Sequence, residues 1–338
     1  MSPFSNRKTA LNCFILLGCL YFLPLKASAA THPKQQQANE TVSKLYHSLE
    51  NFQKFDMPSR LDLLSTQFLG QVYLLGALGE GSGALFNQEP LYRMDAFDCE
   101  TYVDTVLALA LAPNEKGFKQ CIRQIRYKEG KVGFITRNHF TSLDWNLNNQ
   151  QQGFIKDITP LFKDKNNKSV VKIATALINK PSWYQHLSLD TIHLTTPDKK
   201  EQAKKLALLK ARGQNLAKTQ ASIPYIPLTA LFDSKGKANH YLLTQIPNAA
   251  IIEIVRPNWD LTAQTGTHLN VSHLGFAFWK KDILYFRQAS SQYGYVVEVP
   301  LTDYLRKALA SPTIKGINVQ VIVPSKPLPD SCKVTPLQ

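Results

Sequence analysis

The chain has 338 residues, of which 44% are hydrophobic and 19% are charged. This balance is typical of a globular protein with a substantial core, and it excludes a disordered or fibrous chain. With 39 basic and 25 acidic residues, the formal net charge at pH 7 is +14. Such a charge would attract anionic polymers, but charge alone names no partner, so we favour a solvated basic surface.

The N-terminus has the features of an export signal. Arg7 and Lys8 precede a nearly continuous apolar run over residues 11–25, and the small residues ASAA follow at 27–30. A basic start, a short apolar stretch and an A-x-A site predict a secretory signal peptide over residues 1–29. The run is shorter than the roughly 20 residues that a spanning helix needs, so we expect no integral membrane segment in the mature chain.

A second interpretation of this region is the segment LLGC, which ends at Cys19 and looks like a lipoprotein processing site. Apolar residues continue for six positions beyond Cys19, where a mature lipoprotein normally turns polar. Export without a lipid anchor, to the periplasm or the medium, is therefore favoured. Removal of residues 1–29 lowers the net charge from +14 by three, to about +11.

Three cysteines remain after this cleavage, at positions 99, 121 and 332. An odd number in an oxidising compartment leaves at least one unpaired. Cys121 and Cys332 could form a bridge, in which case Cys99 is the free thiol. The spacing alone does not decide the pairing, because a disulfide depends on geometry.

The first part of the mature chain has helical periodicity. Apolar residues recur at helical spacing over 42–52, and a second helix is expected to begin at Ser59, which can cap it. Residues 76–83, GALGEGSG, contain four glycines and predict a flexible loop. The loop leads to FDCETYVDTVLALALA at 97–112, a predicted buried helix that Asp98 would cap.

The middle of the chain, from about residue 146 to 220, is polar and rich in Lys, Asn and Gln. We expect an insertion of helices and loops within a single catalytic domain over residues 30–338. The insertion contains one amphipathic stretch, EQAKKLALLKARGQNLAK, at 201–218. Alternating segments then predict strands at 248–255, 271–279, 283–290, 295–301 and 317–323. Helices followed by strands predict an α+β fold with an antiparallel sheet.

Cys99 stands between Asp98 and Glu100. Two carboxylates beside a thiol oppose its ionisation and raise its pKa. A position in the first turn of a helix has the opposite effect, because the free N–H groups and the helix dipole stabilise an anion. We expect a thiolate at Cys99 if the acids point away and an imidazolium lies close.

The segment VSHLGFAFW at 271–279 offers the imidazole. Alternation places His273 on one face of the strand with Gly275 and Ala277, whose small size leaves room for a packed element or a ligand. A cysteine at a helix start, a histidine on a later strand and a polar residue on the next strand supply a nucleophile, a base and an orienting group.

The length of the hairpin loop decides which residue faces His273. A two-residue loop at 281–282, or a four-residue loop with the same centre, places Gln288 and Ser290 on the face of His273. A three-residue loop would send Gln288 to the opposite face. The prediction therefore depends on the turn.

Other kinds of site have little support in the sequence. HExxH, paired CxxC, GxGxxG and P-loop motifs are absent. His268 and His273 are the nearest histidine pair, but a five-residue spacing puts them on opposite faces of a strand. We expect no metal and no cofactor. The basic residues lack the aromatic interleaving of a nucleic-acid platform, so no nucleic-acid partner is expected.

Together with RNHFTSLDW at 137–145 and FRQASS at 286–291, these motifs resemble the exported muramoyl-alanine amidases of the NlpC-type cysteine peptidase superfamily. The similarity runs from about residue 61 to residue 323. It implies a papain-like core, in which a helix with the nucleophile Cys99 packs on an antiparallel sheet with the base His273. The third, orienting position, commonly His in the superfamily, falls on Gln288, whose amide oxygen accepts a hydrogen bond but carries no negative charge.

The resemblance also implies a substrate site. A tyrosine at position 73 would line it and help to hold an oxyanion, and the aromatic, Arg and Asp side chains of 137–145 suit a sugar ring. Core packing for the tyrosine and an ordinary surface turn for 137–145 are the competing interpretations. The residues expected to contact substrate are Tyr73, Asp98, Arg137, His139, Phe140, Asp144, Trp145 and Ser290.

The activity implied is hydrolysis of the amide bond between N-acetylmuramic acid and L-alanine. The expected substrates are small peptidoglycan fragments, among them those with 1,6-anhydro-muramic acid. Three alternatives stay open: a cysteine endopeptidase that cuts the γ-D-glutamyl-diaminopimelate bond, a catalytically silent wall-binding module, and acyl transfer to an acceptor other than water.

Overall fold

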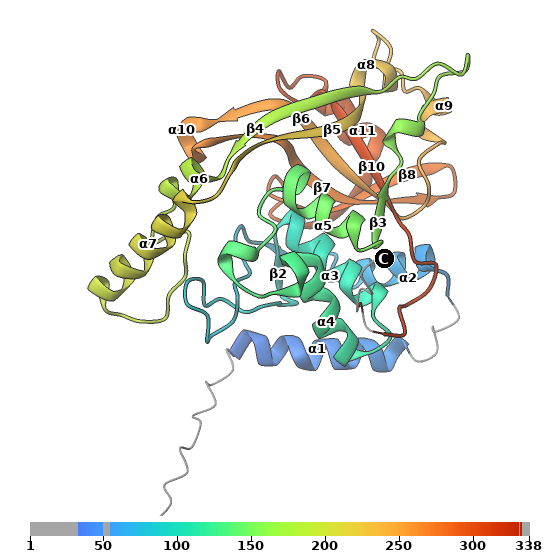
Figure 1. Cartoon of the computed structure of the whole chain (residues 1–338). Coiled ribbons are helices and arrows are strands. Elements are labelled where there is room, and N and C mark those ends of the chain that lie inside the picture. The colour runs from blue at the N-terminus through green and yellow to red at the C-terminus, as the bar shows by residue number, and fades with distance from the viewer. Residues whose placement is uncertain (1–32, 50–54, 331, 333–338) are drawn as a thin grey trace, which may run out of the picture. The chain divides into compact units, whose positions relative to one another are not determined.

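The structure is a computed structural model that describes residues 33–49, 55–330 and 332 (Figure 1). The predicted signal peptide and the alternative site at Cys19 lie outside the described residues. Within the described part of the chain, no helix is long and apolar enough to cross a membrane. The fold is α+β, with helices first and a large, mostly antiparallel sheet formed mainly by the later chain.

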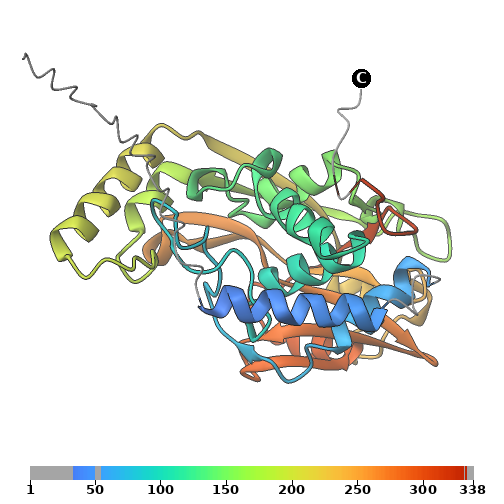
Figure 2. The same cartoon turned by 90° about the horizontal axis from the view of Figure 1, so that it is seen from below.

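The first helices surround the segment that begins with Cys99. They are α1 (Pro33–Leu49), α2 (Met57–Thr66), α3 (Cys99–Leu111), α4 (Glu115–Arg126) and α5 (Asn146–Gln151). The predicted start of α2 was wrong by two residues: Asp56, not Ser59, is its cap, because the Asp56 carboxylate accepts the Ser59 N–H at 2.9 Å. α1 runs alongside α4 (Figures 1 and 2), and its Tyr46 hydroxyl donates to the Leu109 carbonyl of α3 at 3.0 Å.

The sheet has the strand order β2-β1-β9-β8-β7-β6-β10-β5-β4, and β3 pairs with β10. Its strands are β1 (Val72–Tyr73), β2 (Ala96–Phe97), β3 (Ile155–Asp157), β4 (Lys172–Asn179), β5 (Lys218–Pro227), β6 (Ala250–Leu261), β7 (Thr267–Lys280), β8 (Ile283–Ser290), β9 (Tyr295–Pro300) and β10 (Gly316–Ile322). The pair β1–β2 is parallel, and the other strand pairs are antiparallel. The five strands predicted after residue 248 are confirmed as β6 to β10.

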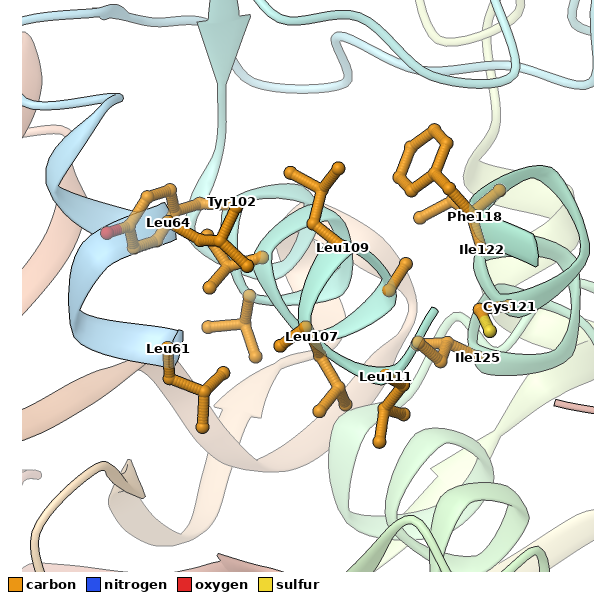
Figure 3. Close-up of a cluster of buried hydrophobic side chains, with 14 of the residues drawn as sticks. Leu61, Leu64, Tyr102, Leu107, Leu109, Leu111, Phe118, Cys121, Ile122 and Ile125 are labelled. Carbon is orange, nitrogen blue, oxygen red and sulfur yellow. The ribbon is translucent and has the colours of Figure 1, made fainter. Parts of the chain in front are cut away.

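A hydrophobic core joins the first helices to one face of the sheet. In this core α3 lies between the other two helices: leucines of α2 pack on one side of it, and Phe118, Ile122 and Ile125 of α4 pack on the other (Figure 3). β7 adds Leu274 and Phe276 from the sheet, and both are buried. Burial of such side chains stabilises the fold by about 25 cal/mol per Å² of apolar surface. It also holds the start of α3 against β7.

The opposite face of the sheet has its own helices. They are α8 (Leu228–Leu231), α9 (His240–Leu243) and α11 (Leu301–Ala308). Leu301 and Leu305 of α11 are fully buried in a second core that includes Ala277 of β7 and Phe286 of β8. Alternate residues of β7 therefore serve two different cores, as the period of a strand requires.

The expectation of helices and loops over 146–220 was wrong in part. This segment supplies β3, β4 and the first residues of β5, in addition to α6 (Lys180–His186) and α7 (Lys199–Gln214). β4 and β5 pair along the length of β4; β4 leads into α6, and β5 follows α7 (Figure 1). In β4 the buried side chains alternate, at Ala174, Ala176 and Ile178, while Ile173 and Leu177 on the other face are exposed. The polar, Lys-, Asn- and Gln-rich composition of the segment as a whole hid this short apolar strand. The helix predicted at 201–218 is confirmed as α7 over most of its length, but it ends at Gln214, and Lys218 already belongs to β5.

A disulfide joins Cys121 of α4 to Cys332 near the C-terminus. The two Cα atoms lie 5.0 Å apart, within the usual range for a disulfide. The pairing left open by the sequence is therefore confirmed, and Cys99 is the free cysteine of the described residues.

Candidate active site

The start of α3 is held by a capping box. The Asp98 carboxylate accepts the Thr101 N–H at 2.8 Å, and the Thr101 hydroxyl accepts the Asp98 N–H at 2.9 Å. The other Asp98 oxygen accepts the Gly76 N–H at 3.1 Å, which ties the glycine-rich loop to the helix. The predicted cap is confirmed. Since both oxygens of Asp98 have backbone donors, a contact with substrate stays a prediction.

Cys99 is the first residue of α3 and is partly buried. Its sulfur receives the backbone N–H groups of Leu274 and Glu100. Burial nevertheless raises the pKa of the Cys99 thiol above its usual value, and the charges of Asp98 and Glu100 raise it further. The neutral thiol is therefore favoured at rest, and the thiolate was expected only with an imidazolium close by.

The turn between β7 and β8 determines what His273 meets. Lys280 pairs with Ile283, so the loop has two residues, and Gln288 lies on the face of His273 as predicted. The His273 Nε2 atom is hydrogen-bonded to the Gln288 amide oxygen. An amide oxygen only accepts, so Nε2 carries the proton and Nδ1 is left as the acceptor.

Gly275 lets β7 and β8 approach at this point. A Cβ atom there would lie 2.6 Å from the Arg287 carbonyl oxygen and 3.0 Å from the Gln288 Cβ. Any larger residue would push the strands apart. The expectation that small residues beside His273 admit a closely packed element is thus confirmed for Gly275.

His273 is a neutral base at physiological pH. Burial lowers its pKa to about 4, and the hydrogen bond that His273 donates to Gln288 partly opposes this shift. Gln288 is 1% exposed, and its amide nitrogen has no hydrogen-bond partner among the described residues. A neutral thiol and a neutral imidazole therefore form the resting state, and the proton has to move during the reaction.

Two tyrosines lie near Cys99, and one of them also contacts His273. The Tyr304 ring of α11 stacks on the His273 ring, with centroids 6.3 Å apart and planes at 24°. Burial, followed by the neighbouring Cys99, raises the pKa of Tyr304 to about 12. Burial followed by Cys99 and Asp98 also raises the pKa of Tyr73 to about 12. Tyr73 thus lies beside Cys99 as expected.

Tyr304 is a site residue that the sequence did not reveal. It belongs to a short helix between two strands, and no periodicity of that helix shows which element its polar residues meet. It also lines a cavity of about 720 Å³ on the His273 side of the site. Gln288 and the buried Ser290 line the same cavity, so three of the predicted residues meet there.

The segment 137–145 lies against the first turn of α3. The Thr141 hydroxyl donates to the Glu100 carboxylate at 3.4 Å. Burial, followed by Asp104 and Asp98, raises the pKa of Glu100, which favours its neutral form. The segment therefore reaches the residue next to Cys99, although through Thr141, which was not among the predicted contacts.

Most predicted side chains of this segment have partners within the protein. The Arg137 Nε atom donates to the Glu80 carboxylate of the glycine-rich loop at 2.7 Å, and Lys180 pairs with Asp144 at 2.6 Å. The fully buried Trp145 donates to Asp104 of α3 at 2.7 Å. These contacts account for Arg137, Asp144 and Trp145 as structural residues, and their contact with substrate stays a prediction.

His139 and Phe140 belong to an aromatic cluster. The His139 ring lies 4.7 Å from Phe134 and 4.7 Å from Trp183, centroid to centroid, and its Nε2 atom bonds to the Phe134 carbonyl at 2.7 Å. Burial, followed by Arg137, holds the pKa of His139 well below its usual value. Among residues 33–49, 55–330 and 332, no group of three His, Cys, Asp or Glu side chains could hold a metal ion.

Comparisons with known proteins agree with this architecture. The family model described as AmiA-like, N-acetylmuramoyl-L-alanine amidase-like, matches residues 63–314. A solved structure from Legionella pneumophila, of family DUF1460, is 54% identical, with a TM-score of 0.84 over 87% of this chain and 97% of that one. None of the curated proteins compared with the chain matches it significantly.

Two solved structures of an N-acetylmuramoyl-L-alanine amidase from Bacteroides uniformis share the fold. One is 24% identical, with a TM-score of 0.56 over 79% of this chain and 99% of that one. The other is 25% identical, with a TM-score of 0.53 over 80% of this chain and 99% of that one. Because the family model covers most of its length, the chain belongs to the AmiA-like family of N-acetylmuramoyl-L-alanine amidase-like proteins.

Proposed function

We propose that the protein is a cysteine-dependent N-acetylmuramoyl-L-alanine amidase with a papain-like core. The observation that carries the proposal is the hydrogen bond between His273 and Gln288 beside Cys99 at the start of α3. A thiol, a base with a free ring nitrogen and a group that orients the base are the three parts of nucleophilic acyl transfer.

The first half-reaction forms a thioester. As the Cys99 sulfur attacks the lactyl carbonyl carbon of muramic acid, His273 Nδ1 takes the thiol proton. The tetrahedral intermediate carries its negative charge on the former carbonyl oxygen, which the Cys99 backbone N–H and the Tyr73 hydroxyl stabilise. The carbon–nitrogen bond then breaks, and the imidazolium gives its proton to the alanine nitrogen.

The second half-reaction consumes water. His273 Nδ1 takes a proton from a water molecule as its oxygen attacks the thioester carbon. The carbon–sulfur bond breaks, and the proton returns to the Cys99 sulfur. The products are a muramic acid carboxylate and a peptide with a free amine, so one water is consumed for each amide bond.

The neutral resting pair supports a particular order of events. Because the Cys99 pKa lies above and the His273 pKa lies below the usual values, proton transfer accompanies the attack and does not precede it. Gln288 contributes orientation, since it fixes the tautomer without adding charge. The role of Gln288 is therefore that of a positioning residue.

The proposal extends to the setting of the enzyme. Residues 30–338 form one catalytic domain, and removal of residues 1–29 accompanies export to the periplasm or the medium. The substrates are peptidoglycan fragments, including those with 1,6-anhydro-muramic acid. The segment 137–145, through its position beside Glu100, contributes to the sugar side of the site.

The test uses the mature chain and its Cys99→Ala variant with defined muramoyl-peptides, and the products are identified by mass spectrometry. We expect free peptide plus free sugar with the native chain and neither product with the variant. Turnover retained by Cys99→Ala would contradict the mechanism. Cleavage inside the peptide would identify an endopeptidase, and binding without any product or thioester would identify a wall-binding module.

A further inference from the structure

The cavity of about 720 Å³ beside His273 contains more than the predicted catalytic residues. Arg256 and Trp259 of β6 line it, as do Asp303 and Lys307 of α11. Its volume lies within the range of roughly 300–1,000 Å³ that is typical of small-molecule sites. The proposed chemistry uses only the edge of this cavity, where His273 lies.

The two cations of the cavity, Arg256 and Lys307, are short of acidic partners. The Arg256 guanidinium donates to the hydroxyls of Ser272 at 3.0 Å and Thr313 at 2.6 Å. It also lies over the Trp259 ring, 4.4 Å from the centroid. Within the described residues, no carboxylate lies within 4.0 Å of a charged nitrogen of Arg256 or Lys307.

The acidic residue of the cavity is engaged elsewhere. The Asp303 carboxylate pairs with Arg306, one turn further along α11, at 2.7 Å. Two cations therefore line the cavity with one acid, and that acid forms an ion pair with a cation outside the lining. Hydroxyl contacts hold the Arg256 side chain in place and leave its charge uncompensated. Such an arrangement suits an anionic ligand.

The chemistry of the site says which part of the substrate enters the cavity. In the proposed mechanism, His273 gives its proton to the nitrogen of the departing alanine. The departing peptide must therefore lie on the imidazole side of the scissile bond, and this cavity is the space that His273 lines. A stem peptide that continues from alanine through γ-linked glutamate carries a free α-carboxylate on the glutamate.

We propose that Arg256 and Lys307 bind the carboxylates of the departing stem peptide and so select acidic muropeptides. Arg256, held by Ser272 and Thr313, meets the carboxylate nearest the scissile bond. Lys307, on the more exposed part of α11, meets a carboxylate further along the peptide. This assignment rests on the proposed amidase function.

The test measures binding of the product peptide to the mature protein by calorimetry. One peptide is L-Ala-γ-D-Glu-diaminopimelate, and the other has the glutamate α-carboxylate converted to the amide. The variants are Arg256→Gln and Lys307→Gln. The matched control is Lys315→Gln, which removes the same charge from an exposed residue outside the cavity.

For the acidic peptide, we expect Arg256→Gln to weaken binding about tenfold, a change of about 1.4 kcal/mol. The amidated peptide should bind weakly to the native protein, and its affinity should change little in Arg256→Gln. Lys307→Gln should weaken binding of both peptides, because the diaminopimelate carboxylates are present in each. Lys315→Gln should bind like the native protein. If Arg256→Gln weakens binding of the acidic and the amidated peptide equally, or weakens neither, the assignment of Arg256 is overturned.

The melting temperature of each variant shows whether weaker binding comes from the missing ligand contact or from a less stable fold. If Arg256→Gln unfolds early through its contacts with Ser272 and Thr313, the exposed Lys307→Gln keeps the proposal testable. If the native protein hydrolyses acidic and amidated muramoyl-peptides equally well, the carboxylate-binding role of the cavity is overturned, while the amidase function stands. Binding that depends on Arg256, without hydrolysis of any muramoyl-peptide, would support the cavity and contradict the amidase function.

Discussion

His273 is the residue whose protonation should limit the reaction in acid. Its pKa is lowered to about 4, chiefly by burial, and only its neutral form can accept the Cys99 proton. Activity should therefore persist on acidification until the pH approaches about 4, well below the point where an exposed histidine becomes charged. The pH profile of kcat/KM measures this directly.

A variant of the orienting residue tests the same point. Gln288→Glu places a carboxylate on His273 Nε2, and this charge should raise the His273 pKa by about one unit or more. The acidic limb of kcat/KM should move upward by the same amount. A native limb near pH 6.5, or a limb that does not respond to Gln288→Glu, would remove His273 from the role of base.

At the scale of the elements, the close approach of β7 and β8 holds the base and its partner together. Gly275→Ala would bring a Cβ atom within 2.6 Å of the Arg287 carbonyl and push the strands apart. We expect a loss of about 1–3 kcal/mol of stability and a fall in kcat of roughly 10- to 100-fold. Ala277→Gly, on the same face of β7, is the control: it should lower stability but keep most of kcat.

β6 carries a buried acid that makes stability depend on pH. Glu253 is fully buried, accepts a hydrogen bond from Asn146 at 3.1 Å, and has its pKa raised to about 8 by burial. Because the Glu253 pKa is higher in the folded than in the unfolded chain, the neutral carboxyl favours folding. This contribution to the free energy of unfolding is fully present below the unfolded pKa of 4.5 and is lost as the pH rises to about 8.

Replacement of Glu253 by an uncharged residue should remove this loss of stability at high pH. Glu253→Gln keeps the size and the hydrogen-bonding capacity but cannot ionise, so its melting temperature should exceed that of the native protein at pH 9. The difference should be smaller at pH 5. The exposed Glu40→Gln of α1 serves as the control. The quantity to compare is the difference in melting temperature between Glu253→Gln and the native protein. If this difference is the same at pH 5 and pH 9, ionisation of Glu253 does not destabilise the fold.

At the scale of the whole molecule, the disulfide ties α4 to the end of the chain. Cys121 and Cys332 are 211 residues apart in the sequence, so the bond constrains most of the unfolded chain. Cys332→Ser should cost about 2–4 kcal/mol of unfolding free energy. A reductant should lower the melting temperature of the native protein but not that of Cys332→Ser. Activity should survive at 25 °C, because the nucleophile Cys99 is not part of the bond.

Several parts of the candidate site could be predicted because they depend on near neighbours in the sequence. The cap at Asp98 needs only a donor three residues on, and the face shared by His273 and Gln288 follows from strand alternation and a two-residue turn. The β4 strand was missed because its short apolar sequence stands inside a long segment rich in Lys, Asn and Gln. Its assignment depends on pairing with β5, which begins 39 residues after β4 ends.

The sequence by itself determined where Cys99 and His273 stand within their elements, because helix capping and strand alternation are local. Only the tertiary structure decided the pairing of Cys121 with Cys332, the stacking of Tyr304 on His273, and the internal partners of Arg137 and Trp145. It also decided that burial raises the pKa of Cys99. Each of these depends on contacts between distant segments and on how much water they exclude, and neither property can be read from residues that are neighbours in the chain.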